Sequence, residues 1–263
     1  MIPIDLSNKT ALVCGSTQGI GLAIAESFAR AGASVILAAR NEERLAEVAK
    51  SLPTINGSVH SYICADFSDL ERVREELKLL MEKKVAIDIL VNNTGGPAPG
   101  PITEANEHQL LNAFSQHLLI SQMMVQQVLP GMKERNYGRI INVISTSVKQ
   151  PIPNLGVSNT IRAAMAGWSK TLSMEVASHG VTVNNLLPGF IQTGRLDSLI
   201  ANKASTGNES PESIRTQLMH SVPAGKFGSP EDLGNFAAFL ASPLAGYVNG
   251  TNIPIDGART SAF

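Results

Sequence analysis

The turn Gly15-Ser-Thr-Gln-Gly19-Ile-Gly21 joins a short apolar run, Thr10–Cys14, to a segment with helical apolar spacing, Gly19–Ala31. Three glycines in such a turn permit a sharp bend, the close approach of a pyrophosphate and close packing of the helix. The helix would present its positive N-terminal end to the phosphates. Glycines also mark purely structural turns, so the strand–turn–helix context is what indicates a dinucleotide site. The predicted cofactor contacts are Gly15, Ser16, Thr17, Gly19, Ile20 and Gly21.

Short β-type runs alternate with helical patterns from one end of the chain to the other. Strands separated by helices in this way form parallel βαβ units with right-handed crossovers. We therefore predict one α/β domain over residues 1–263, a Rossmann-type, doubly wound, seven-stranded parallel sheet with helices on both faces. The predicted strands are Thr10–Cys14, Ser34–Ala39, Val59–Cys64, Ile87–Val91, Arg139–Ile144, Val181–Leu187 and Asn252–Ile255.

One polar segment, about residues 193–225, interrupts this alternation. A long insertion in a compact domain is usually a lid, a binding loop or a disordered segment. Its position after the sixth predicted strand would place it over the carboxyl ends of the strands, where open α/β sheets bind ligands. We predict a lid rather than a plain surface loop.

Composition excludes several function classes. The 263 residues carry a net charge of −1 with scattered basic residues, which predicts no nucleic-acid partner. No apolar run approaches the ~18 residues of a membrane span, and the segment Met1–Asp5 lacks the pattern of a signal peptide. We expect a cytoplasmic protein without a metal site. Cys14 and Cys64 should lie two strands apart, roughly 10 Å, as reduced and buried thiols.

The end of the second predicted strand bears on the choice of cofactor. An acidic residue there would bind a ribose 2′-hydroxyl, whereas an arginine accommodates a 2′-phosphate. The chain reads Ala38-Ala39-Arg40, and guanidinium matches phosphate geometry well. This favours NADP(H) over NAD(H), unless Arg40 is only a solvated residue at the start of a helix.

Further motifs follow the strands in a fixed order. Asp66 follows the third strand, Asn92-Asn93-Thr94-Gly95 the fourth, and Pro188-Gly189 the sixth. With the glycine turn and the C-terminal motifs Gly225–Asp232 and Gly250–Gly257, they resemble the short-chain dehydrogenase/reductase family, especially its β-ketoacyl-acyl-carrier-protein reductases. The resemblance covers essentially the whole chain.

The resemblance implies roles for particular residues. Asp66 would contact the adenine region, Asn92 and Gly95 would line the cofactor, and Pro188-Gly189 would border the nicotinamide. The resemblance also implies a homodimer or homotetramer built on two long helices. Apolar residues on more than one face of these predicted helices, Glu107 to Arg135 and Leu155 to Ser178, agree with that implication.

The family's catalytic positions have changed. The family uses an asparagine, a serine, a tyrosine and a lysine, the last two spaced as Y-x-x-x-K. Ser145, after a strand, aligns with the serine, and the frame set by Ala166–Lys170 puts Ser158 at the tyrosine position and Arg162 at the lysine position. Counting back along the preceding helix puts His117 at the asparagine position.

These changes remove the usual proton route. A serine hydroxyl is a far poorer acid than a phenol, and a guanidinium stays protonated and cannot relay protons. General acid–base catalysis contributes about 10²–10⁴-fold in rate. His117 could shuttle protons if it titrates near neutral pH, or it could simply be satisfied in a helix interface. Lys149 could also reach the pocket, whereas no tyrosine is well placed to do so.

Three functions are consistent with these observations. The first is an NADP(H)-dependent oxidoreductase acting on a small carbonyl or alcohol substrate, similar to 3-oxoacyl reductases but with a non-standard proton route. The second is a catalytically impaired nucleotide-binding protein that acts as a sensor or structural partner. The third is a structural protein that has also lost nucleotide binding, and the intact glycine turn and Arg40 argue against it.

Overall fold

The computed structural model describes residues 3–262, so Phe263 and the first two residues of the segment Met1–Asp5, which was compared with signal peptides above, lie outside it. Seven parallel strands form one sheet in the order β3-β2-β1-β4-β5-β6-β7. This confirms the predicted doubly wound sheet, whose strand order reverses between β1 and β4. The strands are β1 Thr10–Cys14, β2 Ser34–Ala39, β3 Ser61–Cys64, β4 Ile89–Asn92, β5 Gly138–Val143, β6 Val181–Pro188 and β7 Asn252–Ile255.

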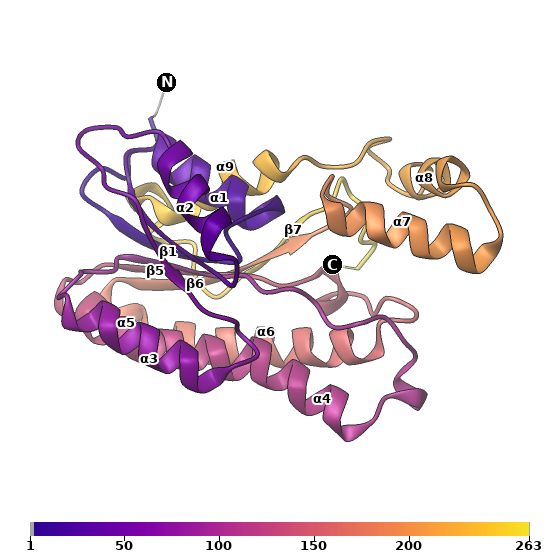
Figure 1. Cartoon of the computed structure of the whole chain (residues 1–263), viewed down its shortest axis with the longest axis horizontal. Helices are drawn as coiled ribbons and strands as arrows, with labels where there is room; N and C mark the ends of the chain where they lie inside the picture. Colours follow the sequence, from indigo (N-terminus) through magenta and orange to yellow (C-terminus); the bar gives the residue numbers. More distant parts are fainter. Residues whose placement is uncertain (1–2, 263) are drawn as a thin grey trace.

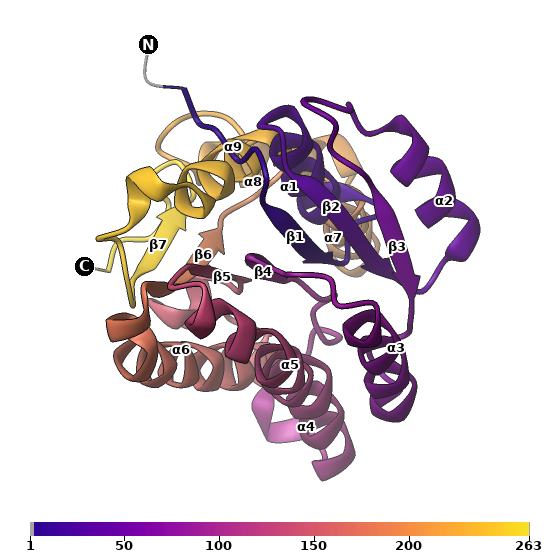
Figure 2. The same ribbon diagram turned by 90° about the vertical axis from the view of Figure 1, so that its left-hand side faces the viewer.

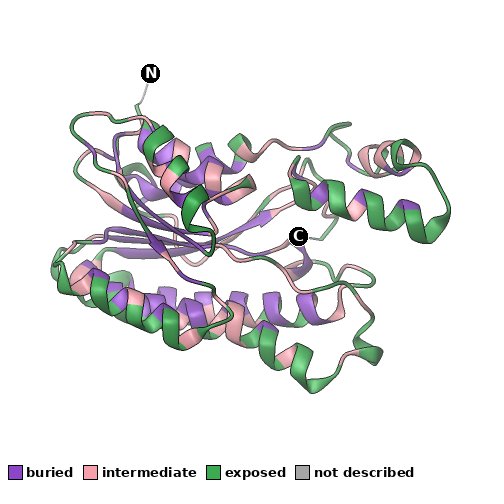
Figure 3. Ribbon diagram, in the orientation of Figure 1, coloured by how far each residue is buried: buried purple, intermediate pink, exposed green. Residues whose placement is uncertain are grey.

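Helices cover both faces of the sheet (Figures 1 and 2). Because side chains alternate along a strand, Ala11 and Val13 face one helical layer while Leu12 and Cys14 face the other. The strands and the inward sides of the helices are accordingly buried (Figure 3). One layer holds α1 Gly19–Arg30, α2 Glu42–Ser51 and α9 Pro230–Ala241, and the other holds α3 Leu70–Glu82, α5 Ile120–Glu134 and α6 Gly156–Val176. No helix within residues 3–262 is long and apolar enough to cross a bilayer.

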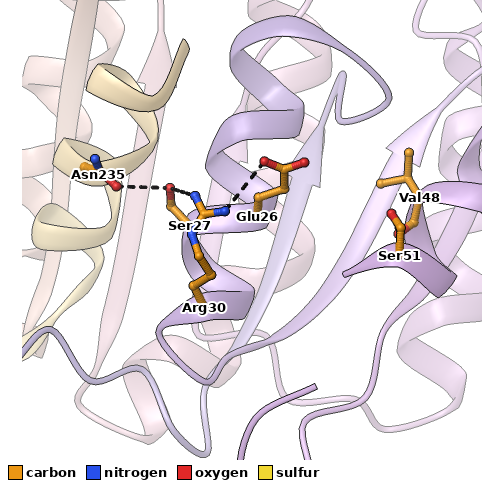
Figure 4. Close-up of polar contacts among 6 residues, drawn as sticks. All are labelled: Glu26, Ser27, Arg30, Val48, Ser51 and Asn235. Carbon is orange, nitrogen blue, oxygen red and sulfur yellow. Dashed lines mark hydrogen bonds and ion pairs between the residues drawn. The ribbon is translucent and has the colours of Figure 1, made fainter. Parts of the chain in front are cut away.

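Helices α1 and α9 pack closely, which anchors the helix that follows the glycine turn. A side chain at Gly234 of α9 would bring its Cβ within 2.6 Å of the Ala23 carbonyl oxygen. Beside this contact, the Ser27 hydroxyl faces Asn235 of α9 at 3.4 Å and accepts a hydrogen bond from Arg30 (Figure 4). The position of α1 is therefore set by the C-terminal part of the chain.

The long helix predicted over Glu107 to Arg135 is interrupted. A π-helix, Ser115–Leu119, separates α4 (Glu107–Phe114) from α5. The Ser121 hydroxyl donates to the carbonyl of His117 at 2.6 Å and satisfies this backbone acceptor in the wider turn. Single π-turns of this kind are frequent at functional sites.

The segment predicted as a lid forms a helical hairpin. Helix α7 (Gly194–Gly207) packs on α8 (Pro211–His220) through apolar residues four apart, Leu196, Ile200 and Ala204, together with Ile214. The hairpin lies beyond the carboxyl ends of the strands (Figure 1). Apolar residues spaced four apart form one continuous apolar face on α7, and this face is enough to pack a segment that is otherwise polar. Its role as a lid stays a prediction.

The cysteines are free, with β2 between their strands as predicted. Cys14 is buried, and burial raises the pKa of its thiol to about 12. Cys64 was expected to be buried but is only half-buried, because β3 forms the open edge of the sheet.

Candidate functional site

The glycine turn is as tight as its sequence predicts. Gly15 and Gly19 have φ values of 60° and 57°, a region that glycine adopts without strain. A Cβ on Gly21 would lie 2.1 Å from the carbonyl oxygen of Gly15. The amide of Asn93 donates to that oxygen at 3.3 Å and ties the turn to the end of β4.

The start of α1 is suited to an anion. Its N-cap residue, Gln18, makes no side-chain capping hydrogen bond, and the first turn holds no acidic residue. The backbone N–H groups at the positive N-terminal end of the helix are therefore free to bind an anion. Helix α2, by contrast, is capped by the side chain of Asn41. The Ser16 hydroxyl is buried and accepts a hydrogen bond from the backbone amide of Ala38, which ties the turn to β2. Thr17 and Ile20 are half-buried around the same turn.

The ends of β2 and β3 carry the residues predicted to bind the adenosine half of the cofactor. Arg40 is exposed directly after β2. Asp66 accepts hydrogen bonds from the backbone and hydroxyl of Ser68, and these bonds, with a smaller effect of the Arg40 charge, lower the pKa of its carboxyl. A charged guanidinium beside an ionised carboxylate can bind phosphate on one side and hydroxyl or amine groups on the other.

Asn92 belongs to an asparagine ladder that the sequence did not predict. Asn92 donates to Asn142 at 2.8 Å, Asn142 to Asn185 at 2.9 Å, and Asn185 to Asn252 at 2.7 Å, in register across β4 to β7. Asn142 also donates to Ser169 of α6 at 2.9 Å. The ladder links the four strands β4 to β7, and the side-chain oxygen of Asn92 is left buried without a partner among the described residues.

The remaining predicted cofactor residues line the same edge of the sheet. Gly95 is exposed, and a side chain there would meet open space. Pro188 and Gly189 are half-buried at the end of β6, and a Cβ on Gly189 would come within 2.6 Å of Asp256. This close backbone contact leaves no room for a side chain and explains why residue 189 is glycine.

Ser145, Ser158 and Arg162 gather beside the carboxyl end of β5. Arg162 of α6 is 7% exposed and donates to the Val143 carbonyl at 3.3 Å, two residues before Ser145. Ser158 lies one helical turn before Arg162 and is buried. The Ser145 oxygen accepts a hydrogen bond from the amide of Ser147 at 3.0 Å, which orients its hydroxyl while leaving its proton free to donate.

His117 lies in the π-helix and faces the same cluster. It is 2% exposed, and its Nδ1 contacts the Thr94 hydroxyl at 2.5 Å. Burial, together with the charges of Arg162 and Arg195, lowers its pKa to about 3. Of the two alternatives for His117, this environment favours the one in which the imidazole is satisfied by its packing and hydrogen bonding, and is neutral at physiological pH.

Arg195 was not predicted as a site residue. It is the second residue of α7, and it reaches back to the Gly96 carbonyl at 3.5 Å. Burial first, and the Arg195 charge second, lower the pKa of Arg162 to about 10, far enough above neutrality that Arg162 stays charged. No sequence signal marks Arg195, because only the fold of the hairpin brings it to the cluster.

The tyrosines lie elsewhere, as expected. Tyr137 precedes β5 at the opposite end of the sheet, where its hydroxyl donates to the Ala241 carbonyl. Tyr62 lies in the edge strand β3, and Tyr247 is fully exposed. A cleft of about 430 Å³ between the α7–α8 hairpin and Asn154 holds none of the predicted site residues.

Comparisons with known proteins agree with this geometry. A family model described as Enoyl-(Acyl carrier protein) reductase matches residues 15–259. The chain is 34% identical to the 3-oxoacyl-[acyl-carrier-protein] reductase FabG of Vibrio harveyi, over 97% of this chain and 98% of that protein. It belongs to the short-chain dehydrogenase/reductase family. Another member, the NADPH-dependent reductase BacG of Bacillus subtilis, is 31% identical over 98% of this chain and 100% of its own.

A solved structure from the short-chain dehydrogenase/reductase family has the same fold. The L-sorbose reductase of Gluconobacter frateurii, complexed with NADPH and L-sorbose, matches with a TM-score of 0.92 and 31% identity over 100% of both chains. The assignment of Ser158, Arg162 and His117 to the positions where the resemblance implies tyrosine, lysine and asparagine stays a prediction. Their cluster is the feature that a proposed function has to explain.

Proposed function

We propose that the protein is an NADP(H)-dependent reductase that acts on a carbonyl or alcohol substrate, similar to 3-oxoacyl reductases. The observation that carries the proposal is the buried, charged Arg162 beside Ser145 at the carboxyl ends of the strands. Open α/β sheets bind their ligands at this edge, next to the switch in strand order. The family relatives described as NADPH-dependent reductases support the same cofactor class.

The chain's residues fit the cofactor. The uncapped start of α1 and the glycine turn would hold the diphosphate, and Arg40 would hold the 2′-phosphate that distinguishes NADP(H). The remaining length of the cofactor would be lined by Asp66, Asn92, Gly95 and the Pro188-Gly189 pair. When bound, the nicotinamide supplies or accepts the hydride.

The cluster's own contribution is electrostatic. Ser145 can donate its hydroxyl proton in a hydrogen bond to a carbonyl oxygen, and Arg162 places a positive charge beside the oxygen where negative charge develops. His117 is neutral and acts as a hydrogen-bonding group rather than as an acid. Ser158 lines the pocket without a phenol's acidity. Solvent water therefore supplies the proton. The rate enhancement comes from positioning the substrate and from stabilising the negative charge that develops on its oxygen.

A binding protein without turnover is the second candidate. Ser158 and Arg162 motivate it, because neither residue replaces the proton transfer of a tyrosine and lysine pair. The family relatives named as reductases favour catalysis over this alternative. A chain without nucleotide binding is disfavoured by the free end of α1.

The deciding experiment measures NADPH oxidation over a panel of ketones, with NADPH binding measured separately by calorimetry. The wild type is expected to turn over at least one ketone. Arg162→Gln should lower kcat/KM by about 10²-fold, because it removes the charge at the reacting oxygen. Lys170→Gln, exposed on the same helix, is the matched control. Tight NADPH binding with no turnover would establish the second candidate, and no binding the third.

Assembly and location belong to the same proposal. A homodimer or homotetramer is supported by exposed apolar side chains on the long helices, Leu111 and Phe114 of α4 and Met174 of α6. Such residues favour burial against a partner subunit. Two free thiols agree with a reducing, cytoplasmic location.

A further inference from the structure

Arg162 is a buried charge without a counterion. Its Nε is buried with no hydrogen-bond partner among the described residues, and its one side-chain bond is to a backbone carbonyl. No carboxylate within residues 3–262 forms an ion pair with it. Removing one partner of a buried ion pair is strongly destabilising, because it leaves an uncompensated charge in a site of low polarity. Arg162 is in that unpaired state in the protein alone.

Arg139 is a second buried arginine, away from the cluster, and its hydrogen bonds can be compared with those of Arg162. It is 4% exposed, yet its guanidinium donates to the carbonyls of Gly138, Gly180 and Ser242 and lies over the ring of Tyr137. Its nitrogens are absent from the buried groups that lack a partner. A comparable set of carbonyl acceptors is not provided for Arg162. The difference indicates that a ligand completes its hydrogen bonds.

Arg195, in the α7–α8 hairpin, is a second cation without an ion pair. It is exposed at the start of α7, where the positive end of the helix disfavours a cation, and within the described part of the chain it forms no ion pair. Its neighbour Asp197 instead pairs with Arg215 of α8 at 2.8 Å. Arg195 also reaches the carbonyl of Gly96 at 3.5 Å, two residues after Thr94, which contacts His117, so its guanidinium lies against the loop that borders the cluster.

The cofactor does not supply the missing negative charge. Its phosphates belong to the adenosine half and the diphosphate, where α1 and Arg40 fit them. Its nicotinamide ribose carries no anionic group. Resting on the proposed reductase function, we propose that the substrate is a carbonyl compound bearing a carboxylate, which Arg162 binds from α6 and Arg195 binds from the hairpin.

This arrangement has a consequence for the hairpin. A carboxylate between the two guanidiniums neutralises their mutual repulsion and links α7 to α6. The hairpin would then close over a charged substrate and not over a neutral one. Substrate selection and closure would depend on the same ion pair.

The test compares three oxo acids, 2-oxobutanoate, 3-oxobutanoate and 4-oxopentanoate, with their uncharged amides. Calorimetry on the NADP⁺ complex measures binding, and NADPH oxidation measures turnover. At least one acid is expected to bind about tenfold or more tightly than its amide, the size of one charge-assisted hydrogen bond. Arg195→Gln should remove this preference, Arg195→Lys should restore part of it, and Arg215→Gln on the same hairpin should keep it.

The outcomes separate this inference from the proposed function. If neutral ketones are reduced while every acid binds no better than its amide, the carboxylate site is wrong and the reductase stands. If acids bind preferentially but no ketone is reduced, the site stands and the reductase is wrong. An acid preference that survives Arg195→Gln unchanged would overturn the assignment to Arg195.

Discussion

His117→Asn should make the protein less sensitive to acid. In the folded state burial and two arginines hold the pKa of His117 at about 3, against an ordinary value of 6.5. Between these values the unfolded chain binds a proton at this position and the folded chain does not. His117 therefore favours the folded state fully above pH 6.5, and this contribution is lost as pH falls from 6.5 toward 3.

The magnitude follows from the pKa difference. Each pH unit within this window costs about 1.4 kcal/mol of unfolding free energy. Between pH 6.5 and about pH 4.5 the wild type should lose about 2.5 kcal/mol through His117 alone. Asparagine has no proton to gain, so the variant should lack this part of the acid sensitivity while keeping the part contributed by other groups.

Urea unfolding at about pH 7 and about pH 4.5 measures the difference directly. The quantity compared is the drop in unfolding free energy between the two pH values, so a uniform loss of stability in the variant cancels. His108→Asn, at an exposed histidine of α4, is the control and should behave like the wild type. An equal drop in wild type and His117→Asn would refute the neutral, buried imidazole, and with it the argument that water rather than His117 supplies the proton.

Three other substitutions test the cofactor site and the sheet. Arg40→Ala should raise the Kd for NADPH about tenfold or more and leave that for NADH unchanged, because a charge-assisted phosphate contact is lost; calorimetry with both cofactors checks this. Asn142→Ala should lower the melting temperature by about 6–10 °C, since it leaves three buried polar partners unsatisfied, whereas exposed Asn112→Ala should not. Gly21→Ala should abolish NADPH binding or folding, as its Cβ would lie 2.1 Å from the Gly15 carbonyl oxygen, and circular dichroism with calorimetry separates the two results.

The tight glycine turn was predictable because its signals are local. The glycines act through their own backbone and their immediate neighbours, so Gly15, Gly19 and Gly21 could be assigned from spacing and context. The substrate half was less predictable. His117 was predicted as a site residue from its position in the chain, but its protonation depends on burial and on charges from α6 and α7, segments far away in the chain.

Alternating strand and helix patterns by themselves determined the parallel sheet and its helical layers, because hydrophobic periodicity and turn residues are properties of neighbouring residues. Only the tertiary structure brought Arg195 to the carbonyl of Gly96, and aligned Asn92, Asn142, Asn185 and Asn252 across four strands. Those contacts join residues tens of positions apart in the sequence. Their energies depend on the low polarity of the protein interior and on buried charges without partners, and both exist only once folding has excluded water.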